Sequence, residues 1–188
     1  MEPRPRIKLL LSPFDKTIEG LCIFLLAALW LSAIYFYWKM PQTIPIHFNA
    51  AGKPHSFGTK GSLLFLPFIG NLIYVGISAL NKHPHVFNYL TPITTENAAE
   101  QYNIATRVLR FIKLVVLIIF ISIVLYSYLS TIGAVGKEGR WFLPIILSFF
   151  LFPTVYMVVQ LSRKKSSTNY CIQAQSAADA PAVSYFVA

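Results

Sequence analysis

Four long stretches without a charged residue constrain this chain more than any other feature. A helix needs about 20 apolar residues to cross a hydrocarbon core of about 30 Å, and each stretch is close to that length. They are residues 20–38, 61–81, 114–136 and 141–162. Because only helices and closed barrels satisfy their backbone groups inside lipid, the pattern predicts an all-α membrane protein with four transmembrane helices.

The composition agrees with that class, because 55% of the 188 residues are apolar and only 12% are charged. We expect residues 1–165 to form a single transmembrane domain. The tail, residues 166–188, is rich in Ser and Ala without a periodic apolar face, so we expect it to be poorly ordered. The first stretch is too long for a signal-peptide core and no small-x-small site follows it, which predicts an uncleaved signal anchor.

The basic residues predict the orientation in the membrane. Eleven of the 16 lie near one side of the predicted spans and five near the other. Since Lys and Arg accumulate on the cytoplasmic side, both termini are predicted to be cytoplasmic. The net charge of +9 is then an orientation signal and an attraction to the lipid bilayer. No basic stretch is interleaved with stacking aromatics, so nucleic acid is not an expected partner.

The loop between the first two spans, residues 39–60, is the most distinctive polar segment. Ile44, Ile46 and Phe48 alternate with polar residues, which predicts an extended segment with one apolar face. A turn is expected next, because Asn bonds its own backbone and Gly adopts positive φ at low cost. We therefore expect an extended, turn-rich outer loop, whose candidate ligand or partner-binding residues are His47, Asn49, Gly52, His55 and Lys60.

The other informative segment is the predicted cytoplasmic stretch, residues 82–113. Its second half has helical periodicity from about Glu96, with Thr94 or Thr95 as the cap, and should run on into the third span. We expect this helix to lie partly along the headgroups through Tyr102 and Leu109. The candidate site residues in this segment are Asn88, Asn97, Tyr102 and Arg107.

Asn71 lies near the middle of the second predicted span. An Asn in lipid is costly unless it is paired, so we expect it to face another helix or a wet cavity. In the first case it joins helices. In the second it lines a polar path, which is the basis of an alternative function as a small transporter or permease-like subunit.

No pattern in the chain predicts catalysis or metal binding. The four histidines divide between the two predicted faces of the membrane, so three cannot meet at one catalytic zinc. No hydrolase, nucleotide-binding or metalloprotease fingerprint is present. The two cysteines, Cys22 and Cys171, are expected to be free thiols. We therefore predict a non-enzymatic protein without a metal or cofactor.

Two segments resemble a known family: IPIHFNAAGKPHSFGTK followed by LLFLPF, and HVFNYLTPITTENAAEQYNIATRVLR. Together they resemble a bacterial membrane domain of unknown function that also forms the front part of immunity proteins against a sporulation-delaying toxin. The core of the resemblance is Pro45, His47, Phe48, Asn49 and Gly52, with Gly58 and Lys60. The family has an acidic residue where this chain has His55, and the immunity proteins are longer.

The resemblance implies the cytoplasmic (inner) membrane of a bacterium. Our leading hypothesis is an envelope module of immunity or signalling type that binds an extracytoplasmic peptide or protein through its outer loop. A homo-oligomer is compatible with the same pattern. A third interpretation is structural, with the loop as a lid over the helices.

The predicted orientation can be tested by labelling. Because the basic residues divide eleven to five, Cys171 and a cysteine introduced by Ser56→Cys should react with a membrane-impermeant maleimide from opposite sides. Labelling of both positions in intact cells would contradict this topology.

Overall fold

The computed structural model describes residues 4–49, 51–89 and 91–134, and from the remainder only residues 141, 144–146, 148, 151–152 and 155. Nearly all of these belong to one compact unit, Met1–Thr154. The fourth predicted span lies mostly outside the described residues. The predicted tail, with Cys171, lies entirely outside them.

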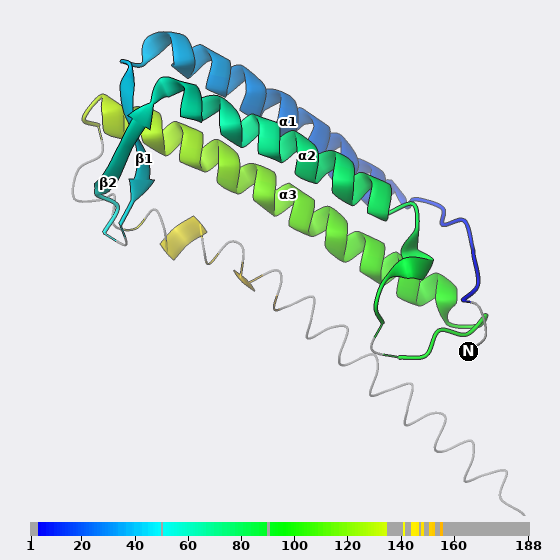
Figure 1. The fold of residues 1–188 in the computed structure, drawn as a ribbon. Helices are drawn as coiled ribbons and strands as arrows, with labels where there is room; N and C mark the ends of the chain where they lie inside the picture. The colour runs from blue at the N-terminus through cyan, green and yellow to red at the C-terminus, as the bar shows by residue number, and fades with distance from the viewer. Residues whose placement is uncertain are drawn as a thin grey trace, which may run out of the picture. The chain divides into compact units, whose positions relative to one another are not determined.

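Three helices run side by side in this unit: α1 (Pro13–Lys39), α2 (Phe65–Leu80) and α3 (Ala98–Thr131) (Figure 1). A short 3-10 turn, η1 (Lys60–Leu64), leads into α2, and a second, η2 (Pro84–Val86), follows it. Among the described residues three segments, namely α1, η1 with α2, and α3, are long and apolar enough to cross a membrane. They overlap the first three predicted spans.

The start and end of α1 follow from its sequence. Ser12 caps the helix, since its hydroxyl accepts a hydrogen bond from the Asp15 backbone N–H while the Asp15 carboxylate accepts one from the Ser12 backbone N–H. Pro13 occupies the first helical position, where a missing N–H costs nothing. At the other end Pro41 follows the cap residue Met40, and the chain leaves in an extended conformation.

The prediction that the segment beginning near Glu96 continues into the third span is confirmed, because α3 is one helix of 34 residues. At about 1.5 Å per residue it is about 50 Å long, more than the roughly 30 Å of a hydrocarbon core. The expected contact of Tyr102 with headgroups is wrong. Tyr102 is fully buried, and its hydroxyl donates a hydrogen bond to the Pro5 carbonyl at 3.1 Å.

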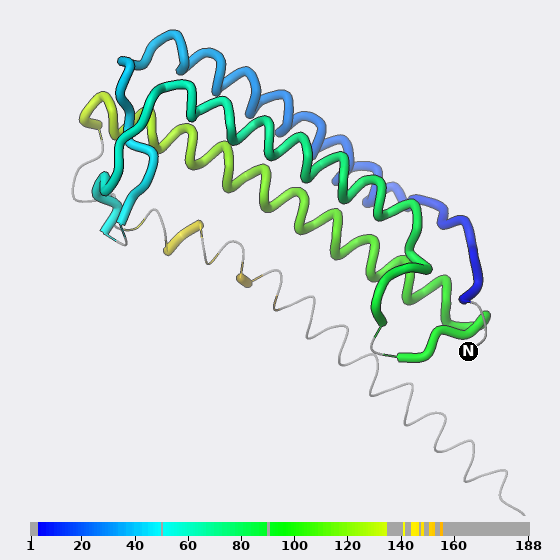
Figure 2. Tube along the Cα trace, viewed as in Figure 1, coloured from blue at the N-terminus to red at the C-terminus, as the bar shows by residue number. Residues whose placement is uncertain are grey.

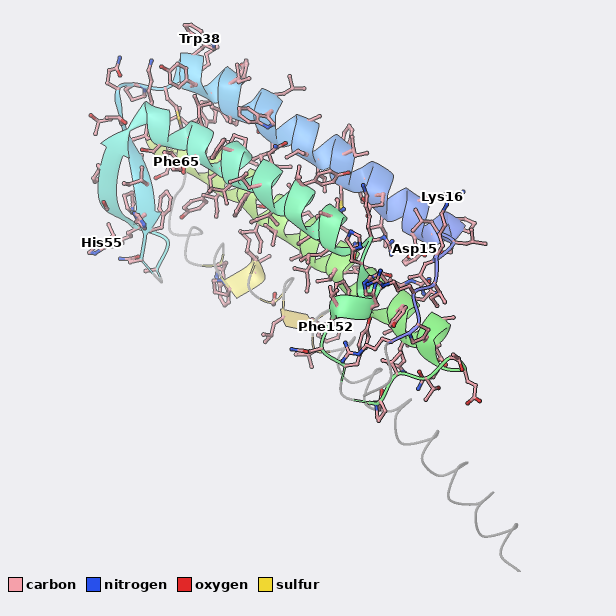
Figure 3. All side chains as sticks on the ribbon, turned by 45° about the vertical axis from the view of Figure 1, so that its right-hand side comes forward. Asp15, Lys16, Trp38, His55, Phe65 and Phe152 are labelled. Atoms are coloured by element: carbon pink, nitrogen blue, oxygen red, sulfur yellow. The ribbon has the colours of Figure 1, made fainter. Side chains whose placement is uncertain are left out.

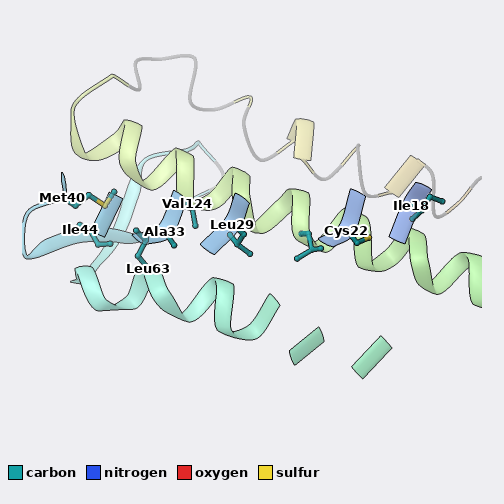
Figure 4. Packing of buried hydrophobic residues seen from close by; sticks show 9 residues of the cluster. Ile18, Cys22, Leu29, Ala33, Met40, Ile44, Leu63 and Val124 are labelled. Carbon is teal, nitrogen blue, oxygen red and sulfur yellow. The ribbon is translucent and has the colours of Figure 1, made fainter. Parts of the chain in front are cut away.

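Apolar packing holds the three helices together along their length. The core runs down α1 through Cys22, Leu29 and Ala33 and continues into the residues beyond α1 (Figure 4). On α2, Gly70 makes the close approach, since a Cβ added there would lie 3.1 Å from Leu29 and 3.4 Å from Phe120. Small residues at such crossings let helix backbones approach closely, which is the main source of packing energy inside lipid.

Between α1 and α2 the chain forms an antiparallel hairpin of β1 (Thr43–Phe48) and β2 (Pro54–Thr59), seen at the end of the helices in Figure 2. The register shifts on both sides of His47, so a bulge interrupts β1. Ile44 is buried and Ile46 and Phe48 are half-buried, but Pro45 is buried as well. Burial therefore does not alternate strictly along β1, and the departure lies at Pro45, before the bulge.

Candidate binding site at the hairpin

The turn of the hairpin is built on Asn49. Its side-chain Oδ1 accepts hydrogen bonds from the backbone N–H groups of Ala51 and Lys53, each at 3.0 Å. Gly52 has φ of 71°, a conformation that costs glycine little and other residues more. Asn49 and Gly52, both candidate binding residues, therefore shape the turn through their own backbone and side-chain bonds.

Tyr126 of α3 fixes this turn to the helices. Its hydroxyl donates a 2.6 Å hydrogen bond to the Gly52 carbonyl, and its ring meets the edge of Phe48 with centroids 4.7 Å apart. Both Tyr126 and Gly52 are buried. In the sequence Tyr126 has only the signature of an aromatic near a helix end, and nothing local indicates that it binds a glycine 74 positions earlier.

A cavity of about 170 Å³ lies between the hairpin and α3. Ile46, Phe48 and Tyr126 contribute apolar surface, while His47 and Asn49 stand at its polar side. His47 is exposed. An engineered apolar cavity of about 150 Å³ binds benzene, so this space is large enough for one aromatic ring or one branched aliphatic side chain.

The remaining candidate residues of the loop lie on β2 and at its end. His55 is exposed and projects from the far end of the hairpin (Figure 3). Lys60 is half-buried, with its ammonium group 4.7 Å from the centroid of the Tyr37 ring of α1. Residues 39–60 contain three lysines and no acidic residue. The loop of residues 39–60 therefore contributes positive charge only.

The opposite end of the helices holds a partly buried cluster of charges. Asp15 on α1 pairs with Arg107 at 3.0 Å, and Glu19 pairs with Arg110 at 3.2 Å and with Lys113 at 2.7 Å. Lys113 is completely buried, and it also donates to the Ser78 hydroxyl of α2 at 3.0 Å. Asp15 is labelled in Figure 3, at the start of α1.

Arg107, a candidate site residue, thus belongs to a cluster that joins α1 to α3. The sequence analysis used these cations to orient the chain and named Arg107 as a candidate site residue, but it did not predict their carboxylate partners. A signal was present, because Asp15 and Glu19 are four residues apart and the three cations follow at intervals of three, so each set shares one helix face. Charges in or near lipid are expected to pair with one another in this way.

The other candidate residues at this end make mainly local contacts. The Asn97 amide accepts a hydrogen bond from the Thr94 backbone N–H and donates one to the Pro92 carbonyl, so it closes the loop before α3. Asn88 is exposed. Burial raises the pKa of Tyr89 to about 12, and its hydroxyl donates to the Pro84 carbonyl at 2.8 Å. The structure does not bring Asn88, Asn97 and Arg107 into one cluster.

Asn71 is exposed on α2, although the preceding residue, Gly70, is buried against α1 and α3. The three described helices therefore do not enclose Asn71 in a polar path between them. Within the described part of the chain, no group of three or more His, Cys, Asp or Glu side chains could hold a metal ion.

Comparison with known protein families gives a match that includes the hairpin. Residues 23–70 match a domain of unknown function (DUF1648), a span that begins within α1, includes the whole hairpin and ends within α2. An uncharacterised protein of Archaeoglobus fulgidus is 30% identical over 86 residues, which is 42% of this chain and 47% of that protein. The chain thus spans less than half the length of that relative. No solved structure matches.

The hydrogen bond from Tyr126 to Gly52 predicts a stability effect. Tyr126→Phe keeps the ring against Phe48 but leaves the buried Gly52 carbonyl without this donor, which should cost about 1–3 kcal/mol. Hydrogen exchange at residues 51–58 should become faster. Tyr128→Phe is the matched control, because Tyr128 stacks on Phe36 through its ring. Equal exchange in the two variants would show that the bond does not hold the hairpin.

The charge cluster predicts a second effect on the stability of the protein. Lys113→Met leaves Glu19 with Arg110 alone, and Glu19 is 24% exposed, so the loss should be about 2 kcal/mol, less than for a fully buried pair. Thermal unfolding in detergent measures it. The exposed Lys82 gives the control, since Lys82→Met should change stability by less than about 0.5 kcal/mol. Equal melting temperatures would contradict a stabilising role for the cluster.

Proposed function

We propose that this protein is a non-enzymatic module of the bacterial envelope that binds an amphiphilic peptide at its hairpin, in an immunity or signalling role. The observation that carries the proposal is the cavity between the hairpin and α3, with an apolar lining and the exposed His47 beside it. A cavity of about 170 Å³ suits a single apolar side chain and not a whole small molecule with several rings.

The charge of the loop supports the choice of partner. Residues 39–60 contain Lys39, Lys53 and Lys60 and no acidic residue, so a peptide with carboxylates is attracted to the loop and a cationic one is repelled. Trp38 and Phe65, at the adjoining ends of α1 and α2, are 77% and 70% exposed (Figure 3). Exposed aromatics of this kind favour the membrane interface, where an amphiphilic peptide concentrates.

Rigidity also favours binding. The turn is held by two bonds to Asn49 and by the bond from Tyr126, so less conformational freedom remains to be lost when a partner binds. The match of residues 23–70 to a domain of unknown function includes this whole hairpin. The proposed location is the cytoplasmic membrane, with the hairpin on the outer side and both termini in the cytoplasm.

The test uses purified protein in lipid nanodiscs and two fluorescein-labelled acidic peptides. One alternates valine and glutamate and is extended; the other is an amphipathic helix of leucine and glutamate. Binding of either by fluorescence anisotropy is the expected result. His47→Ala should weaken it about tenfold, which is about 1.4 kcal/mol, with the melting temperature unchanged because His47 is exposed.

His83→Ala is the control variant, since His83 is an exposed histidine that follows α2 at the other end of the helices. It should bind like the wild type. The proposal fails if neither peptide binds the wild-type protein, or if His47→Ala and His83→Ala bind equally well.

A further inference from the structure

Among the described residues, β1 packs against α3, whereas no described strand pairs with the outer edge of β2. β1 lies against α3, because Phe48 meets Tyr126 and the cavity lies between them. Within the part of the chain that the structure describes, the sheet has two strands, so β2 has a strand partner on one side. An open edge presents main-chain N–H and C=O groups that another extended chain can pair with.

The register identifies the groups that are open. The Lys60 N–H donates to the Gln42 carbonyl at 2.9 Å, so these two residues form a hydrogen-bonded pair. Such pairs alternate along an antiparallel ladder, which makes Pro45 and Phe57 a non-hydrogen-bonded pair. Pro45 has no N–H and fits that position without losing a ladder bond.

It follows that the N–H and C=O of Phe57 point away from β1. Within the described residues, no backbone hydrogen bond reaches Phe57 from outside the hairpin. The Phe57 side chain is 61% exposed, and His55 and Thr59 beside it are exposed too. The centre of β2 therefore combines an apolar ring with main-chain groups that have no partner among the described residues.

The flanking charges determine what can pair with this edge. Lys53 precedes β2 and Lys60 follows it, and no acidic residue lies between them. Antiparallel pairing of two copies of β2 would bring Lys53 of one copy beside Lys60 of the other, which is unfavourable. An acidic strand would instead gain two ion pairs. Charge complementarity thus favours a peptide over a second copy of this chain.

We propose that β2 binds an extended, acidic peptide as a third strand, with main-chain hydrogen bonds to Phe57. Alternate apolar side chains of the peptide pack on the Phe57 ring, and its carboxylates lie near Lys53 and Lys60. This is recognition by strand addition, in which the main chain supplies affinity and alternate side chains supply specificity. The inference rests on the proposed function and adds the conformation and polarity of the partner.

The experiment compares the extended valine–glutamate peptide with the same peptide N-methylated at alternate amides, on wild-type protein in nanodiscs. N-methylation removes donors from one edge of the peptide and keeps its charge and side chains. We expect the unmodified peptide to bind and the methylated peptide to lose detectable binding. Replacement of glutamate by lysine should abolish binding as well.

Two protein variants distinguish the contribution of the Phe57 backbone N–H to peptide binding from that of its aromatic ring. Phe57→Ala and Phe57→Pro both remove the ring, but only proline removes the N–H, and at this position it costs no bond to β1. Phe57→Pro should bind the extended peptide about fivefold to tenfold more weakly than Phe57→Ala. Unchanged binding by the methylated peptide overturns the inference whatever the variants do, so it does not depend on the folding of Phe57→Pro.

The remaining outcomes distinguish failure of strand addition from failure of the proposed function. If only the helical leucine–glutamate peptide binds, the proposed function stands and strand addition is wrong. If neither peptide binds, both are wrong. Dimerisation in detergent that Phe57→Pro abolishes, with no peptide binding, would assign the edge to a second copy and overturn the inference.

Discussion

The ion pairs between α1 and α3 are the constraint on which the placement of the other parts depends. Apolar helices in lipid can slide along one another at little cost, because lipid tails pack against any apolar side chain that a neighbouring helix uncovers. The pairs of Asp15 and Glu19 with Arg107, Arg110 and Lys113 remove this freedom, since a shift of one turn would leave buried charges unpaired. The cluster therefore sets the register of α1 on α3.

The register of α1 on α3 also determines where the hairpin lies along α3. Tyr126 follows Lys113 by 13 residues on α3, a rise of about 20 Å. The hairpin follows the end of α1. The hydrogen bond from Tyr126 to Gly52 forms only if the hairpin lies level with Tyr126 along α3. Two polar contacts, one near each end of α3, thus fix an interface that is otherwise apolar.

The sequence predicts those parts of the fold that a local rule governs. Three helices follow from uncharged stretches because lipid leaves the backbone few alternatives, and the continuity of α3 follows from its periodicity. Asn49 and Gly52 indicate a turn because both act on their own backbone. The partners of Tyr126 and Arg107 could not be derived in the same way. They depend on which helices become neighbours. The spacing of the charges places the two carboxylates on one helix face and the three cations on another, but it does not specify that these two faces meet.

Hydrogen bonding within the turn separates the residues of the candidate site into two kinds. The Asn49 side chain and the Gly52 carbonyl form hydrogen bonds that hold the turn itself, so substitution there changes the shape of the hairpin before it changes any contact with a partner. His47, His55 and Phe57 are exposed on a turn that is already fixed. A surface that binds a partner needs both kinds of residue, because exposed groups select a ligand only if the backbone beneath them holds one conformation. In the hairpin, the Asn49 side chain holds the turn from within, and Tyr126 of α3 holds it from outside through the Gly52 carbonyl and the Phe48 ring.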